Sequence, residues 1–107
     1  MKNIYVCSPL RGDIEENIRK AKEYSRKIAL DGNLPVTPHL YLTTFLDDRM
    51  EEEREIGMAI ALEWLKRCDE VYVFGEPSEG MKREIRLAGT LGIKIVRGWP
   101  LILEFPF

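Results

Sequence analysis

Short runs of apolar residues and longer segments with helical periodicity alternate along the chain. Residues 3–7 form a β-branched and aromatic run that is typical of a buried strand, which we expect near the centre of a sheet. Apolar residues then recur at the helical period between Asp13, a predicted N-cap, and a predicted stop at Asp31 and Gly32. The chain therefore opens with a strand, a turn and a helix.

The middle of the chain predicts a weak strand, a long connection and a second helix. Residues 34–37 read as a strand weakened by Pro35, and residues 39–50 have no clean period, as in lids and binding loops. Residues 51–68 predict a helix with an acidic first turn. Because apolar residues cover more than half of its circumference, this helix is either sunk deep in the fold or in contact with a second subunit.

The last part of the chain repeats the strand and helix pattern. Residues 69–91 predict a buried strand, a tight turn and a helix that ends at Gly92, and residues 93–96 predict another strand. Glu84 falls on the apolar arc of this helix, where a carboxylate is unusual. Residues 98–107 form an apolar tail that we expect to be an edge strand or to dock on a partner.

The alternation of elements predicts a single α/β domain over residues 1–107, since a chain of this length supports one core. We expect a small Rossmann-like or flavodoxin-like three-layer sandwich. Its sheet would be mostly parallel, with four to five strands, right-handed crossovers and helices on both faces.

Composition narrows the functional class. A net charge of −2 and a sequence pI near 5.5 argue against a nucleic-acid partner. Cys7 and Cys68 lack metal-ligand spacing and are interpreted as reduced, buried thiols. Because no signal peptide or membrane-length apolar run is present, we expect a soluble, cytoplasmic protein with no membrane partner, no metal and no cofactor.

The loops after the first and third strands should meet where the strand order reverses, at the carboxyl edge of the sheet. The first loop offers Ser8, Arg11 and Gly12 before a helix, and Ser78 with Gly80 repeats the arrangement at the next helix start. The functional interpretation is that the N-termini of two helices face one phosphate group. The alternative is that Ser78 is an ordinary cap and Arg11 a surface charge.

Four further residues are candidates for chemistry. Glu84 could act as a nucleophile or general base, or it could simply reach a neighbouring arginine or solvent. His39, the single histidine, could border a ligand or be a packed loop residue. Asp47 and Asp48 could bind ribose hydroxyls or be solvated.

These motifs, taken together and in order, resemble the nucleoside 2-deoxyribosyltransferase superfamily. The resemblance is strongest to its 2′-deoxynucleoside 5′-phosphate N-hydrolase branch and extends to small bacterial and phage relatives without an assigned activity. It covers the chain to about residue 96 and rests on residues 4–7 with Arg11-Gly12, Thr37-Pro38-His39, Leu62-Glu63-Trp64-Leu65 with Asp69, and Ser78, Gly80 and Glu84.

The resemblance implies a flavodoxin-like homodimer that binds a nucleoside or nucleotide. In such enzymes a glutamate attacks the anomeric carbon, and water or a second base resolves the glycosyl-enzyme; Glu84 stands at that position. The resemblance further implies that Tyr5 lines the pocket and that His39 borders the sugar or base. It places a 5′-phosphate against Arg11, Gly12, Ser78 and Gly80.

The chain departs from the family at two places. Ser8-Pro9 replaces a glycine-serine or glycine-proline step, and Ala61 stands where relatives carry the acid that protonates the leaving base. General-acid catalysis contributes roughly 10²–10⁴-fold in rate, so Glu55, Asp47 or Asp48 would have to supply it. Two other hypotheses follow, namely a nucleotide-binding module with little or no turnover and a dimeric interaction protein.

Overall fold

The computed structural model describes residues 1–100 and confirms the α/β architecture. Within that range four parallel strands form one sheet in the order β2-β1-β3-β4. Along the chain the elements are β1 (Asn3–Cys7), α1 (Ile14–Leu30), β2 (Leu34–Val36), α2 (Pro38–Leu42), α3 (Glu51–Leu65), β3 (Glu70–Val73), α4 (Glu79–Leu91) and β4 (Lys94–Arg97).

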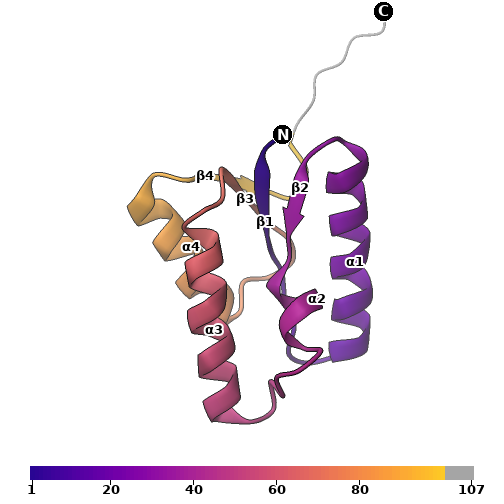
Figure 1. Ribbon diagram of the computed structural model, residues 1–107, viewed down its shortest axis with the longest axis vertical. Helices are drawn as coiled ribbons and strands as arrows, with labels where there is room; N and C mark the ends of the chain where they lie inside the picture. Colours follow the sequence, from indigo (N-terminus) through magenta and orange to yellow (C-terminus); the bar gives the residue numbers. More distant parts are fainter. Residues whose placement is uncertain (101–107) are drawn as a thin grey trace, which may run out of the picture.

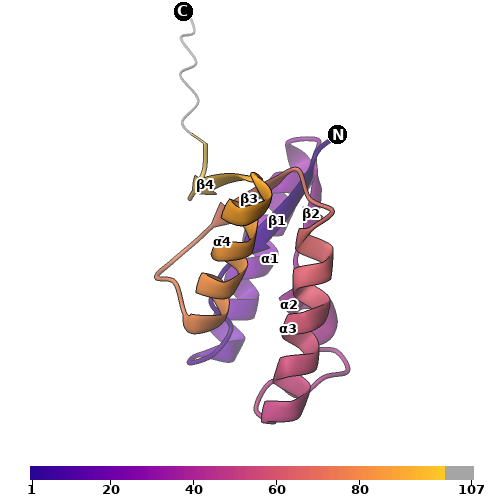
Figure 2. The ribbon, with the colours of Figure 1, turned by 90° about the vertical axis from the view of Figure 1, so that its left-hand side faces the viewer.

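The sheet is the middle of three layers, as predicted. Helix α1 covers one face, and helices α3 and α4 cover the other (Figures 1 and 2). Strand β1 lies inside the sheet between β2 and β3, which confirms its predicted central place. The order reverses between β1 and β3, because the helices that follow these two strands cover opposite faces.

Alternation along β1 supplies both halves of the core. Ile4 and Val6 point toward α1 and pack with Ile28, whereas Tyr5 and Cys7 point toward α3 and α4. These four side chains are almost fully buried. A strand buried on both faces explains why its sequence reads as one continuous apolar run.

Two predicted helix ends are confirmed by their caps, whereas helix α3, predicted over residues 51–68, ends at Leu65. The Asp13 carboxylate accepts a hydrogen bond from the backbone N–H of Glu16 at the start of α1. At the end of α4, Gly92 has a φ of 71°, a left-handed conformation that costs glycine little. Local sequence signals therefore set these boundaries.

Two features of the middle region differ from the sequence expectation. Residues 39–42, predicted as part of a connection, form the short helix α2 together with Pro38, which lies in its first turn, where proline is tolerated. Five residues are too few to show a helical period. Helix α3 is not sunk in the fold, since only Ala61 and Leu65 are buried and Ile56 is 52% exposed.

The start of the apolar tail packs on the α1 side of the sheet. The Trp99 ring lies 4.9 Å from the Phe74 ring and 6.2 Å from the Tyr24 ring, measured between centroids, and Lys27 lies over it. The predicted edge strand or docking segment over residues 101–107 lies outside the described residues. In residues 1–100, each helix is too short or too polar to cross a bilayer.

Two leucines provide a test of this core. Leu65 is fully buried and Leu30 is 69% exposed. We expect Leu65→Ala to lower the free energy of unfolding by about 2–5 kcal/mol, and Leu30→Ala to change it by less than about 1 kcal/mol. Urea denaturation followed by circular dichroism measures both, and equal effects would contradict the packing described here.

Candidate functional site

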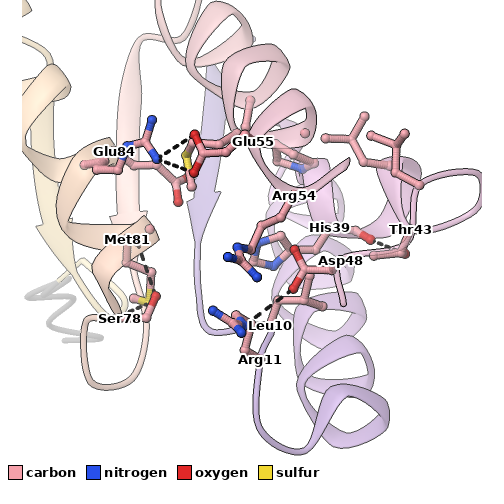
Figure 3. Close-up of a pocket in the computed structure, with 18 of the residues that line it drawn as sticks. Leu10, Arg11, His39, Thr43, Asp48, Arg54, Glu55, Ser78, Met81 and Glu84 are labelled. Carbon is pink, nitrogen blue, oxygen red and sulfur yellow. Dashed lines mark hydrogen bonds and ion pairs between the residues drawn. The ribbon is translucent and has the colours of Figure 1, made fainter. Parts of the chain in front are cut away.

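A cavity of about 510 Å³ opens at the carboxyl ends of β1 and β3. Its walls come from the loop after β1, from α2 and the connection behind it, from α3 as far as Ala61, and from the first two turns of α4 (Figure 3). Eight of the ten residues proposed from the sequence line it: Tyr5, Ser8, Arg11, His39, Asp48, Ser78, Gly80 and Glu84. Gly12 and Asp47 are not among the lining residues.

The loops after β1 and β3 meet as the strand order requires. The backbone N–H of Phe74 donates to the carbonyl of Cys7 at 2.9 Å. Gly75 has a φ of 76°, and a Cβ at this position would lie 3.2 Å from Pro9. The Cys7 thiol in turn donates to the Met81 carbonyl of α4 at 3.9 Å. The base of the cavity is thus fixed by contacts between the two loops.

Glu84 is the most unusual residue of the cavity. Its side chain lies on the apolar side of α4, and the residue is only 4% exposed. Burial raises the pKa of its carboxyl from the usual 4.5 to about 7, and a hydrogen bond from Tyr5 opposes part of this rise. Within residues 1–100 no cation forms an ion pair with Glu84, and the adjacent Arg83 binds Glu55 at 3.2 Å.

Tyr5 approaches Glu84 from the central strand. The residue is 1% exposed, and burial together with the nearby Glu84 charge raises the pKa of its phenol well above 10. Tyr5 therefore stays protonated and acts as a donor to the carboxylate. The Glu84 carboxylate, with no cation bound to it in residues 1–100, remains able to form a bond to a ligand.

Two polar atoms in the cavity wall lack a partner. The Ser8 hydroxyl oxygen and the Nδ1 atom of His39 are buried without a hydrogen bond to any group in residues 1–100. Burial lowers the pKa of His39 to about 4, so its imidazole is neutral at pH 7. Unpaired buried polar groups cost about 1–3 kcal/mol each, which a ligand with matching polar groups would offset.

Charged residues gather around Asp48 at one end of the cavity. The Arg11 Nε atom lies 3.9 Å from the Asp48 carboxylate. Burial raises the pKa of Asp48, and the charges of Arg11 and Arg54 oppose this rise. Arg54 was not predicted as a site residue, because it follows three glutamates in a helix turn whose charges read as a solvent-exposed face.

The start of α4 is occupied by local contacts. The Ser78 hydroxyl accepts a hydrogen bond from the backbone N–H of Met81 at 3.3 Å, which is the ordinary cap weighed as the alternative to phosphate binding. At Gly80 a Cβ would lie 2.8 Å from the Met58 methyl group of α3. A side chain at this position would therefore require the flexible end of Met58 to move.

Ala61, which stands where relatives carry the acid for the leaving base, faces the cavity. Ala61 lines the wall and carries no ionisable group. Of the three possible substitutes, Glu55 and Asp48 line the cavity, but Glu55 is paired with Arg83. Asp47 does not line it, and its carboxylate lies 2.9 Å from Arg49, which lowers the pKa of Asp47.

The sequence of this chain matches one known family of domains. The family model described as "Domain of unknown function (DUF7768)" matches residues 2–98. No curated protein matches the sequence.

The fold is shared with solved structures that include two 2-deoxyribosyltransferases. One is a 2-deoxyribosyltransferase from Bacillus psychrosaccharolyticus, with a TM-score of 0.71 and 17% identity, over 94% of this chain and 76% of that one. The other is a 2-deoxyribosyltransferase from Leishmania mexicana, with a TM-score of 0.62 and 15% identity, over 91% of this chain and 63% of that one. The chain thus has a deoxyribosyltransferase-like fold, but spans less than two thirds of the second relative.

The raised pKa of Glu84 predicts how stability depends on pH. Because the folded-state pKa is raised, the stability is complete below about pH 4.5 and falls as the pH rises through about 7. The cost of ionising Glu84 at pH 8 is on the order of 3 kcal/mol, which Glu84→Gln removes. We expect this variant to unfold at a higher temperature than the wild type at pH 8 but not at pH 4.5.

Thermal unfolding at the two pH values measures this difference. Glu76→Gln is the matched control, because Glu76 is exposed and does not line the cavity. An unfolding temperature that responds equally to both substitutions would show that Glu84 is not buried in the ionised form.

Proposed function

We propose that this chain, which belongs to the family of domains of unknown function DUF7768, cleaves the N-glycosidic bond of a nucleoside or nucleoside 5′-monophosphate. The sugar is then released to water or transferred to a second base. The observation that carries the proposal is Glu84, a buried carboxylate without a cationic partner in residues 1–100, on the wall of a 510 Å³ cavity. The 2-deoxyribosyltransferases with the same fold support this choice of substrate class.

In the proposed reaction Glu84 is the nucleophile. One carboxylate oxygen forms a bond to the anomeric carbon, and the bond from that carbon to the base nitrogen breaks. The base leaves with the bonding electrons and takes a proton from water. A second water then cleaves the glycosyl ester, or a second base attacks it, and Glu84 is regenerated. Tyr5 orients the carboxylate throughout.

The remaining proposed contacts concern the substrate. Ser8 and His39 supply the two unpaired polar atoms for the sugar or base. Arg11, with Ser78 and Gly80 at the start of α4, would hold a 5′-phosphate. Gly12 would serve the loop through its positive φ of 96° rather than by lining the cavity.

A nucleotide-binding module with little turnover is the second candidate. Ala61 on the cavity wall is the observation that favours it, because no side chain there can protonate the leaving base. Loss of such an acid lowers rates by about 10²–10⁴-fold. Thermal stabilisation by a nucleotide without release of free base would identify this case.

The enzymatic proposal predicts a pH profile as well as an activity. Incubation with a panel of ribo- and deoxyribonucleosides and their 5′-monophosphates should release free base, detected by chromatography. The rate should increase with pH and reach half of its maximum near pH 7, because only ionised Glu84 attacks. Glu84→Gln should lose at least about 100-fold in rate, whereas Glu76→Gln should not. No base release from any substrate would sink the enzymatic proposal.

We also propose that the chain forms a homodimer through the outer side of α2 and α3. Tyr41, Phe45 and Ile56 are each more than half exposed there, and the Tyr41 ring lies 5.0 Å from the Phe45 ring and 5.5 Å from the Trp64 ring, measured between centroids. Exposed apolar surface of this kind is typical of interfaces.

Light scattering at micromolar concentration tests the dimer. The expected mass is twice the 12.4 kDa of the chain, and Ile56→Asp should return it to a folded monomer, checked by circular dichroism. A wild-type mass of 12.4 kDa would refute the proposal.

A further inference from the structure

We infer that Arg54, together with Arg11, forms an anion-binding end of the cavity, and that Asp48 is an internal counter-ion which a bound anion displaces. The chemical class of the ligand, a phosphate group on the substrate, rests on the proposed function. The location rests on the charged groups themselves, which come from three separate segments of the chain.

Those segments converge at one place. Arg11 precedes α1, Asp48 lies in the connection before α3, and Arg54 is in the first turn of α3. Figure 3 shows the guanidinium of Arg54 directed toward Asp48 and Arg11. The influence of both arginines on the titration of Asp48 is consistent with this proximity.

The existing contacts leave the guanidinium groups able to bind. The distance of 3.9 Å between Arg11 and Asp48 is beyond hydrogen-bond reach, so the donors of Arg11 are not used up by this carboxylate. Arg54 makes no ion pair within residues 1–100, whereas its neighbours Arg49 and Arg83 are paired with Asp47 and Glu55. Two guanidinium groups lie against the Asp48 carboxylate, and their forked donors suit a phosphate. Glu53 also lines the cavity, but its carboxylate accepts a hydrogen bond from the backbone N–H of Asp47.

This end of the cavity is also separate from the nucleophile. Figure 3 shows Glu84 on the α4 side of the cavity and Arg11, Arg54 and Asp48 on the other side. In keeping with this, burial and Tyr5 set the pKa of Glu84, and neither arginine contributes to it. Negative charge on the ligand would therefore be held away from the Glu84 carboxylate, which a phosphate would otherwise repel. Ser8 and His39, with their unpaired atoms, also line the cavity and remain available to the neutral part of the ligand.

Inorganic phosphate is the probe for this site. Its effect on the unfolding temperature is compared with that of sodium chloride at equal ionic strength, for the wild type and for four variants. Arg54→Gln and Arg11→Gln each remove one donor group, and Asp48→Asn removes the competing charge. Arg86→Gln is the matched control, because Arg86 is exposed on α4, has no ion pair in residues 1–100 and does not line the cavity.

We expect phosphate to stabilise the wild type and Arg86→Gln equally. The apparent affinity should fall about tenfold or more in Arg54→Gln and in Arg11→Gln, and should rise in Asp48→Asn. Arg11 is largely exposed, so its variant should fold even if Arg54→Gln does not. Absence of a phosphate-specific shift in the wild type, equal losses in Arg54→Gln and Arg86→Gln, or weaker binding by Asp48→Asn would each overturn the inference.

The outcome is independent of turnover. Phosphate binding with these variant effects but no release of base would retain the anion site and reject the enzymatic proposal. Release of base from nucleosides, with no response to phosphate, would retain the enzyme and reject the anion site.

Discussion

The burial of one carboxylate is the constraint on which the site depends. Glu84 lies on the apolar side of α4 against the central strand, where ionisation is costly and no cation from residues 1–100 offsets it. The hydroxyl of Tyr5 is the one group identified as stabilising the ionised form. A fold that buries a carboxyl with a pKa near 7 is less stable at neutral pH than the same fold with an uncharged side chain at this position. That cost is characteristic of functional sites rather than of structural cores.

Much of the fold follows from local signals. Continuous apolar runs predicted the strands, caps at Asp13 and Ser78 predicted the helix starts, and Gly92 predicted a helix end. Glu84 stood out because its position on the helical arc conflicts with its charge. These features are visible in sequence because each depends on neighbours within about one helical turn.

Other features depend on contacts between distant segments, which periodicity does not report. Arg54 reads as one charge among several in an acidic helix turn, and only the course of residues 43–50 brings it beside Asp48. Helix α2 is too short to show a period. The unpaired atoms of Ser8 and His39 became apparent only with the packing around them. The fold is shared with 2-deoxyribosyltransferases, and we propose that these residues determine what this chain binds.

The central claim is that the Glu84 carboxyl is buried, has a pKa near 7 and is available as a nucleophile when ionised. A titration of its side-chain carboxyl carbon by NMR, with the signal assigned from its absence in Glu84→Gln, tests this most directly. The structure predicts a midpoint at a pKa of about 7. A midpoint near the ordinary glutamate value of 4.5 would contradict it, because the carboxylate would then be solvated or paired with a cation.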